Sequence, residues 1–342
     1  MNILFDIAHP SDVHTYRHVR KKLISAGHNV LFMARDKDVV MELLDAYGIP
    51  YEKGTRAGSG RISIGFELIK WFFKAFRLIK KHEIDLAVSL SSPSTAWAAK
   101  VNGIPHIMFN DTESGVAQLI MARPATKTIY TPECLLADWG PKQTRYKSIH
   151  DMAYLRPEQF DPGKPELKTP YALIRFVSWN ASHDKGVQST SSEMKKNLCS
   201  LLAGHMDIHI SAEGPLPSEL EQHRLAAPPH RLHNILAHAE IVVGDGATTA
   251  TEAAVLGTPS VYISHFAPHL GYCRLLGDYG LISAVSEGED GICEIRRIME
   301  NPEPEKREAA VKKLMAETIN LTDYIFQEIL KLEPLETRPA VL

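Results

Sequence analysis

The sequence predicts an α/β protein made of two Rossmann-like, doubly wound domains that face a central cleft. Short apolar runs alternate with amphipathic helical segments along nearly the whole chain. The runs are apolar on both faces, which is typical of strands in a parallel sheet covered by helices on both sides. The length of 342 residues exceeds that of one ordinary hydrophobic core.

The first half of the chain contains five predicted strands. The run NILFDIA predicts a strand over 2–8 that ends before Pro10, and a helix is predicted over 14–26, ending at Gly27. Further strands are predicted over 29–34, 85–90, 105–109 and 127–131. Residues 156–169 hold three prolines and a glycine, which is the composition of a linker. We therefore expect an N-terminal Rossmann-like domain at residues 1–160.

The alternation resumes after this linker. Strands are predicted over 171–177, 206–211, 240–243 and 260–263, with helices near 190–203 and over 248–256. A charged helical stretch follows at about 304–333. We expect a C-terminal Rossmann-like domain at 170–310 and a C-terminal helix and tail at 311–342. Ligands of open α/β sheets bind at the carboxyl ends of the strands, so the loops directly after strands hold the candidate residues.

Composition excludes several classes of protein. A net charge of −3 and a pI near 6.6 do not fit a general nucleic-acid binder. Four isolated cysteines indicate a reduced, cytoplasmic protein without disulfides. The N-terminus does not resemble a signal peptide, and no stretch approaches the ~18 apolar residues that span a bilayer. No HExxH or other metal-ligand spacing occurs, and we expect neither a metal nor a cofactor.

The segment 236–260 is the most informative. A predicted strand runs into Gly244-Asp245-Gly246-Ala247-Thr248-Thr249 and then directly into a helix. Small residues allow backbone N–H groups to approach an anion, and a helix N-terminus carries a partial positive charge. Glu252 lies one turn into the helix, within reach of a ribose attached to a bound phosphate. The alternative is structural: Gly246 makes a tight turn, and Glu252 is an ordinary acidic residue of the first helical turn.

This segment carries a family resemblance. The run from Leu236 to Pro259, with its core DGATTATEAAVLGTP, resembles the nucleotide-sugar motif of GT-B proteins. These include the N-acetylglucosaminyltransferase of peptidoglycan lipid-intermediate synthesis and the non-hydrolysing UDP-N-acetylglucosamine 2-epimerases. Over most of residues 1–285, the chain resembles more closely a GT-B family of unknown function, with the motifs DIAHPSDVH, YTPEC, RFVSWNASHD and DGATTATEAAVLGTP in this order. The resemblance implies that Glu252 holds the ribose hydroxyls and that the backbone of Gly246, Ala247, Thr248 and Thr249 contacts the diphosphate.

The loop from Ala8 to His14 follows the first predicted strand. The transferase relatives carry a glycine-rich loop ending in a histidine here, and His14 is the matching position, although Pro10, Ser11 and Asp12 replace the expected glycines. His14 could donate to a phosphate or accept a proton from an attacking hydroxyl, and a neutral histidine suits the second role. Asp12 could orient His14 or cap the helix.

A second candidate loop, 110–115, follows the predicted strand 105–109. Asp111 and Glu113 could serve there as base and stabiliser, or only as turn and capping residues. The resemblance places a glutamate of the epimerases in a comparable loop. Those enzymes also need an acidic residue after the preceding strand, where this chain has Ser89 to Ser94 and no carboxylate. This difference disfavours epimerisation.

A third candidate loop follows the first strand of the second domain. Its side chains Ser178, Asn180, Ser182 and His183 are candidate donors to a sugar or a phosphate. Trp179 could stack on a base or a sugar, or it could brace the loop from a buried position.

The segment 65–81 is an amphipathic helix with a basic face. Four cations gather on one side, with two aromatic residues beside them: Lys70, Lys74, Arg77 and Lys81, flanked by Trp71 and Phe73. The opposite side, Leu68, Phe72, Phe76 and Ile79, is expected to pack on the sheet. Two interpretations remain open: contact with an anionic membrane surface, or a basic face that is simply solvated.

Together these features predict a glycosyltransferase that takes a sugar from a UDP-type donor, for a lipid-linked or cell-envelope acceptor. The candidate bases are His14, Asp12 and Glu113. The alternatives are a UDP-N-acetylglucosamine 2-epimerase-like enzyme and a non-catalytic nucleotide-sugar binder. We expect a cytoplasmic protein without nucleic-acid partners. If residues 65–81 contact a membrane, its inner face is the expected place.

Overall fold

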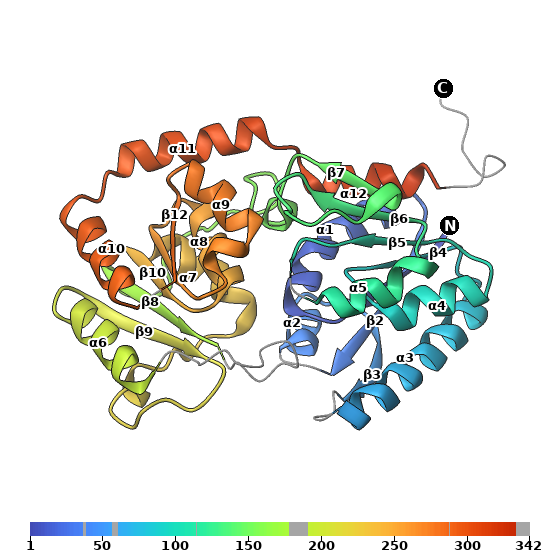
Figure 1. The fold of residues 1–342 in the computed structure, drawn as a ribbon, viewed down its shortest axis with the longest axis horizontal. Helices are drawn as coiled ribbons and strands as arrows, with labels where there is room; N and C mark the ends of the chain where they lie inside the picture. Colours follow the sequence, from blue (N-terminus) through green and yellow to red (C-terminus); the bar gives the residue numbers. More distant parts are fainter. Residues whose placement is uncertain (37–38, 57–60, 114, 178–190, 287, 333–342) are drawn as a thin grey trace. The chain divides into compact units, whose positions relative to one another are not determined.

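The computed structural model describes residues 1–36, 39–56, 61–113, 115–177, 191–286 and 288–332, which form two compact units (Figure 1). The first unit comprises Met1–Glu133, Ala137–Tyr154 and the chain from Ile319. The second comprises Cys134–Leu136 and Leu155–Thr318.

The described part of the first unit forms a seven-stranded parallel sheet in the order β3-β2-β1-β4-β5-β6-β7. Its strands are β1 (Asn2–Ile7), β2 (Asn29–Asp36), β3 (Tyr51–Arg56), β4 (Leu86–Ser89), β5 (His106–Phe109), β6 (Thr128–Pro132) and β7 (Gln143–Tyr146). Its α-helices are α1 (Pro10–Ser25), α2 (Val40–Ala46), α3 (Arg61–Lys81), α4 (Pro93–Val101), α5 (Val116–Ala122) and α12 (Leu321–Leu330). The strand order reverses between β1 and β4, which is where open α/β sheets bind ligands.

The described part of the second unit forms a five-stranded parallel sheet in the order β12-β11-β10-β8-β9. Its strands are β8 (Tyr171–Phe176), β9 (Asp207–Ala212), β10 (Ile241–Gly244), β11 (Ser260–Ile263) and β12 (Ile282–Val285). Its α-helices are α6 (Ser192–Ala203), α7 (Leu232–His238), α8 (Ala247–Leu256), α9 (Gly271–Asp278), α10 (Gly288–Glu300) and α11 (Pro304–Glu317). Here the order reverses between β8 and β10.

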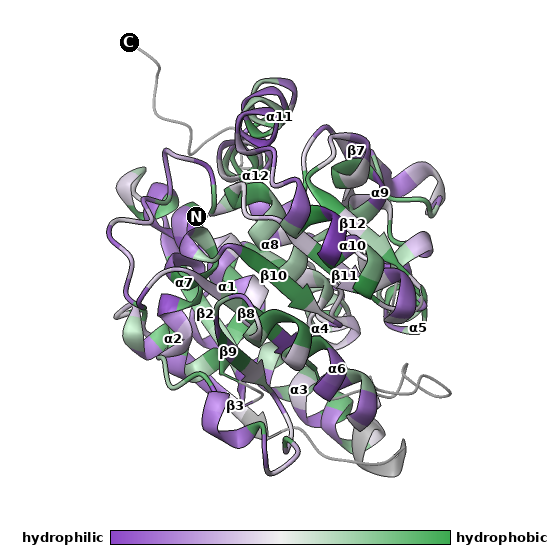
Figure 2. Cartoon of the chain, turned by 90° about the vertical axis from the view of Figure 1, so that its left-hand side faces the viewer, coloured by the Kyte–Doolittle hydropathy of each residue, from purple (hydrophilic) through white to green (hydrophobic). Residues whose placement is uncertain are grey.

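Helices cover both faces of the second sheet. Ile174 and Phe176 of β8 pack with α6 and α10, whereas Tyr171 and Leu173 of the same strand pack with α7 and α8. Alternate residues of a strand point to opposite faces, so an entirely apolar strand requires cover on both sides. Figure 2 shows the hydrophobic colour of β8 and β10 between helices that carry polar residues. The predicted α/β class with two parallel sheets is confirmed.

Three strands were not predicted, and all three lie at sheet edges. β3 and β7 are the two outer strands of the first sheet, and β12 is an outer strand of the second. The sequences of β3 and β7, YEKGTR and QTRY, are polar because an outer strand is partly solvated. They therefore lack the continuous apolar run by which the inner strands are recognised.

The C-terminal segment predicted at 311–342 is divided between the units. Helix α11 belongs to the second unit, whereas α12 packs against α1 and the short 3-10 helix η3 (His150–Ala153) in the first. The Tyr130 hydroxyl donates to Glu328 at 3.0 Å, and the Thr322 hydroxyl donates to the Ala153 carbonyl at 2.6 Å. The chain thus returns to the first sheet after it completes the second.

Helix α3 packs Phe72, Phe76 and Ile79 against the core as predicted, but its buried face also includes residues that the sequence did not assign to it. Trp71 and Ala75 are fully buried in the core of the first unit, and Ile79 is nearly so. The Trp71 indole donates to Asp6 on β1 at 2.8 Å, which places this ring inside the unit instead of on the flank of the basic face. No helix in the described residues is long and apolar enough to span a membrane.

Candidate functional site

The turn from β10 to α8 lies close against β8 and requires glycine. Gly244 has φ +156°, and a Cβ atom there would lie 1.9 Å from the Arg175 carbonyl oxygen. A Cβ atom at Gly246 would lie 2.8 Å from Cγ of Arg175 and 3.2 Å from Cγ1 of Val177. A side chain at 244 has no space without backbone movement, so the turn can approach β8 only with glycine.

Asp245 joins the ends of the two strands at the point where the strand order reverses. Its buried carboxylate accepts from the Val177 N–H at 2.8 Å. Val177 directly follows β8, and Asp245 directly follows β10. The bond fixes the two carboxyl ends side by side, where a doubly wound sheet binds its ligand.

The N-terminus of α8 opens at this edge. Its N-cap, Gly246, provides no side-chain cap, and Thr248 in the first turn is exposed. The first N–H groups of a helix have no partner within the helix, and the helix dipole makes this end attractive to an anion. The arrangement suits a phosphate oxygen without a bound cation.

Glu252 lies in the second turn of α8, and it is buried, with 4% of its surface exposed. Its Oε1 lies 2.9 Å from Nε2 of His233 on α7, which is also buried. The Phe160 ring meets His233 edge-on, with 5.9 Å between the ring centres. Glu252 is therefore a fixed, paired carboxylate. The sequence did not reveal His233, because nothing in the spacing of α7 sets this histidine apart.

The four predicted donors of the second unit and the predicted stacking residue all lie outside the described residues: Ser178, Asn180, Ser182, His183 and Trp179.

Asp12 of the first unit caps helix α1. Its Oδ2 accepts from the N–H groups of Ala8 and His9 at 2.8 and 2.9 Å, in a capping box with His9 as N-cap. These two bonds show the capping alternative for Asp12. Burial raises the pKa of Asp12 from 3.8 to about 7, and the charges of Asp6 and Asp111 add to this rise.

His14 is buried among aromatic side chains in the first turns of α1. Its Nδ1 lies 3.5 Å from the Tyr47 hydroxyl, and its ring centre lies 5.3 Å from that of Tyr154. Only 6% of its surface is exposed. The contacts of the His14 ring described here are thus with Tyr47 and Tyr154.

The loop after β5 contains a contact that the sequence did not suggest. Oδ2 of Asp111 lies 3.1 Å from Nδ1 of His150 in η3. Burial lowers the pKa of His150, while the charge of Asp111 acts in the opposite direction. The charge of Asp111 also raises the pKa values of Asp12 and Tyr16, so these groups share one electrostatic environment at the carboxyl edge of the sheet. Glu113 is partly buried in the same loop.

The loop after β4 contributes hydroxyls and no carboxylate. The Ser89 hydroxyl bonds Nε2 of His106 at 2.9 Å, and the Ser92 side chain caps α4 by accepting from the Thr95 N–H. The Ser94 hydroxyl donates to the Leu68 carbonyl at 2.8 Å. These serines thus hold β4 and α4 to the neighbouring elements β5 and α3. Within the described residues, no group of three or more His, Cys, Asp or Glu side chains is arranged to hold a metal.

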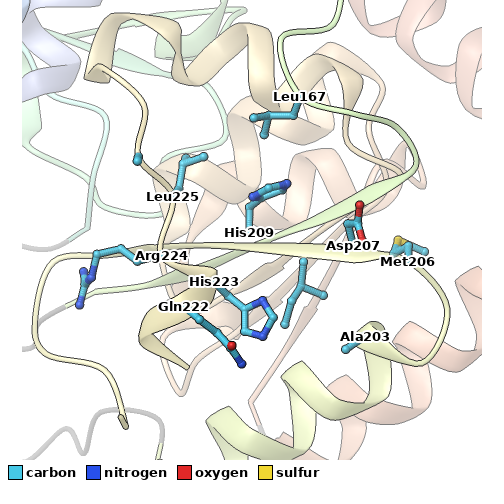
Figure 3. Close-up of a pocket in the computed structure, with 11 residues that line it drawn as sticks. Leu167, Ala203, Met206, Asp207, His209, Gln222, His223, Arg224 and Leu225 are labelled. Carbon is cyan, nitrogen blue, oxygen red and sulfur yellow. The ribbon is translucent and has the colours of Figure 1, made fainter. Parts of the chain in front are cut away.

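A pocket of about 560 Å³ lies elsewhere, beside the outer strand β9 (Figure 3). Its lining includes Asp207 and His209 of β9, together with His223 and Arg224 from the following loop. Arg224 is already bonded to Glu221 and to two backbone carbonyls. The lining contains none of the predicted site residues, and it lies along the strand instead of at the β10–α8 turn.

Comparison with solved structures decides the fold. The described geometry matches the glycotransferase of kitacinnamycin with a TM-score of 0.66 at 14% identity, covering 97% of this chain and 99% of that one. It matches the UDP-GlcNAc 2-epimerase of Neisseria meningitidis bound to UDP-GlcNAc with a TM-score of 0.72 at 11% identity, covering 97% and 100%. It also matches MurG of Acinetobacter baumannii with a TM-score of 0.59 at 15% identity, again covering 97% and 100%.

The chain has the GT-B fold. The resemblance read from the sequence is confirmed at this level, since both transferases and epimerases of the GT-B type are among the similar structures. Neither a protein-family model nor a curated protein sequence matches the chain. At 11–15% identity the likeness defines the fold, and the activity has to be argued from the site.

Proposed function

We propose that this GT-B protein is a glycosyltransferase that binds a nucleotide-sugar donor of the UDP type on its second unit and an acceptor on its first. The observation that carries the proposal is the β10–α8 turn, with its required glycine and the paired Glu252 behind it. This combination offers an anion site and a fixed hydrogen-bond acceptor on one helix.

The donor would contact two parts of α8. The diphosphate would lie at the N-terminus, against the backbone of Gly246 to Thr249, and the ribose hydroxyls would donate to the carboxylate of Glu252. Nε2 of His233 lies 2.9 Å from Oε1 of Glu252, so the carboxylate that would accept the ribose hydrogen bonds is oriented before the nucleotide binds. The predicted side-chain donors Ser178, Asn180 and His183 would add contacts from the loop after β8.

Transfer needs a base and a stabilised leaving group. The acceptor hydroxyl would lose its proton to a side chain of the first unit while its oxygen attacks the anomeric carbon. The bond from that carbon to the diphosphate breaks, and the electron pair leaves with the nucleotide. Backbone N–H groups and the dipole of α8 would stabilise the charge that develops on the diphosphate.

The serine loop after β4 favours transfer over epimerisation. The resemblance to epimerases calls for a carboxylate after this strand. The chain has Ser92 and Ser94 there instead, which cap α4 and bond the Leu68 carbonyl of α3. A reaction that removes and restores a proton on the sugar itself lacks its second acidic group here.

A lipid-linked acceptor is supported by an exposed apolar face on three successive helices of the first unit. Eight large apolar side chains on these helices are exposed: Phe66, Ile69 and Phe73 on α3, Trp97 and Val101 on α4, and Val116, Ile120 and Met121 on α5. Exposed cations of α3, among them Lys70 and Arg77, adjoin them. An apolar surface with a basic rim fits the headgroup region of an anionic membrane. We therefore place the protein in the cytoplasm, at the inner face of the membrane.

The proposal is tested by incubating the protein with UDP-N-acetylglucosamine and other nucleotide sugars, followed by product analysis. Release of UDP with a hydrolysed sugar or a glycoside supports transfer. A changed hexosamine among the products would instead identify an epimerase. Binding without turnover, seen as a rise in thermal stability alone, would identify a non-catalytic binder.

A further inference from the structure

Asp111 in the loop after β5 contacts His150 in helix η3, and the Asp111 side chain is the more exposed of the two. His150 is buried, with 5% of its side chain exposed, whereas 27% of the Asp111 side chain is exposed. Nδ1 of His150 lies 3.1 Å from Oδ2 of Asp111. One partner is therefore fixed inside the unit, and the other reaches its surface at the carboxyl edge of the sheet.

The other nitrogen of His150 differs from that of an ordinary core histidine. In His106, one ring nitrogen lies 2.9 Å from the Ser89 hydroxyl, and the other lies 3.0 Å from the Thr126 hydroxyl. Nε2 of His150 is buried without a hydrogen-bond partner in the described structure. An unsatisfied buried nitrogen carries a free-energy cost that a purely structural contact would avoid. In the described structure, the contact of the His150 ring is thus the one that Nδ1 makes with Asp111.

Burial favours the neutral form of His150, because it lowers the pKa of the ring. A carboxylate beside Nδ1 of a neutral imidazole favours the tautomer that carries its proton there. The ring can then donate to Asp111 and orient it without cancelling its negative charge. A lysine or an arginine in the same place would add a full positive charge.

The other candidates for the base are less suited by geometry. Asp12 is buried, and its Oδ2 is committed to two backbone N–H groups. His14 is buried between Tyr47 and Tyr154. Oε2 of Glu113 is buried as well. Asp111 combines partial exposure with a fixed orientation.

We propose that His150 is a positioning residue that holds the Asp111 carboxylate, and that Asp111 is the base which takes the proton from the acceptor hydroxyl. The inference rests on the glycosyltransferase function proposed above. The proton passes from the hydroxyl to an oxygen of Asp111 as the hydroxyl oxygen bonds to the anomeric carbon. The bond between that carbon and the diphosphate breaks, and its electron pair leaves with the UDP.

The test compares His150→Leu, which removes the donor, with His150→Asn, whose amide N–H can occupy the place of Nδ1. The probe is hydrolysis of UDP-N-acetylglucosamine, with water in place of the acceptor. His150→Leu should lower kcat roughly 10- to 100-fold, as expected for one lost hydrogen bond to a charged group, with KM nearly unchanged. His150→Asn should restore most of this loss. His106→Asn is the matched control, and it should lower Tm while kcat stays at the wild-type value.

Several outcomes would overturn the proposal. An unchanged kcat in folded His150→Leu excludes the positioning role. If His150→Asn is as impaired as His150→Leu, the hydrogen bond that the ring N–H donates to Asp111 is not the cause of the loss. If His150→Leu does not fold, Asp111→Ala on the intact His150 background takes its place, and it should lower kcat further than His14→Ala and Glu113→Ala. A larger loss in either of those two variants assigns the base to that residue instead.

A spectroscopic readout separates this inference from the proposed function. In protein labelled with ¹⁵N-histidine, the His150 resonance, assigned by its loss in His150→Asn, should report the tautomer protonated at Nδ1, and Asp111→Ala should remove that preference. The opposite tautomer in wild type refutes the positioning of Asp111, whatever the activity. If no nucleotide sugar binds or reacts, the proposed function fails and the role of Asp111 as base fails with it, but the NMR result still decides the contact.

Discussion

Asp12 is a buried carboxylate whose protonation should make the stability of the protein depend on pH. Burial raises its pKa from 3.8 to about 7, so between these values the folded state binds more protons than the unfolded state. Stability from this group is therefore fully present below about pH 4 and is lost as the pH rises toward 7. At about 1.36 kcal/mol per pKa unit, the whole change amounts to roughly 4 kcal/mol.

Replacing Asp12 with Asn removes this dependence. The amide oxygen can still accept from the N–H groups of Ala8 and His9, and the amide nitrogen takes the place of the carboxylate oxygen that has no partner. Relative to wild type, Asp12→Asn should gain roughly 2–3 kcal/mol of unfolding free energy between pH 5 and pH 8. The gain arises because wild type must ionise a buried group over this range, whereas the amide stays neutral.

Urea unfolding of the full chain, followed by circular dichroism at pH 5 and pH 8, measures the effect. Asp278→Asn, an exposed residue of α9, is the matched control and should change stability by less than about 0.5 kcal/mol at both pH values. A difference between Asp12→Asn and wild type that is the same at both pH values would show that Asp12 is ionised throughout. The raised pKa would then be wrong.

The remaining predictions concern the donor turn and the exposed helical face. Glu252→Gln should weaken binding of UDP-N-acetylglucosamine by ~1.5–3 kcal/mol, measured by calorimetry, because the charged acceptor for the ribose is lost; an unchanged affinity removes Glu252 from the site. Gly244→Ala should destabilise the protein by at least about 2 kcal/mol in urea unfolding. The control Gly65→Ala, at an open helical position, should stabilise it by up to ~1 kcal/mol. Equal effects of the two substitutions would contradict the claim that position 244 requires glycine. Lys70→Glu combined with Arg77→Glu should abolish sedimentation with phosphatidylglycerol vesicles at low salt, since each cation contributes ~1 kcal/mol, while neutral phosphatidylcholine vesicles serve as control. If wild type fails to bind the anionic vesicles, the basic face is only solvated.

The fold could be predicted because its inner strands are apolar on both faces. β1 and β8 are buried along nearly their whole length, and runs of this kind are visible in sequence without any partner. The start of α1 was placed four residues late, because Pro10 was interpreted as the end of a strand. The structure uses Pro10 as the first helical residue, behind the N-cap His9.

The buried face of α3 shows why helical periodicity alone falls short. The pattern of charges placed Trp71 beside the cations, but its indole N–H bonds Asp6 on β1 inside the core. Lys74, which was counted with the free cations, bonds the Lys53 carbonyl and lies 3.7 Å from Glu52. Both contacts join residues far apart in the chain, and a helical wheel contains no information about them.

Sequence patterns were equally incomplete for the two candidate sites. In each site, a histidine from a distant element contacts the candidate carboxylate. The sequence identified Glu252 and the acidic loop that contains Asp111, but it did not identify the histidines that hold them, His233 and His150. Each histidine comes from a different element of its unit, so no local spacing could reveal the pair. A neutral imidazole can orient a carboxylate through its ring N–H without adding a permanent positive charge. The carboxylate keeps its capacity to accept a hydrogen bond or a proton, and the two roles proposed here, binding the ribose hydroxyls and deprotonating the acceptor, depend on that capacity. Arginine at either histidine position would preserve the contact and weaken the function.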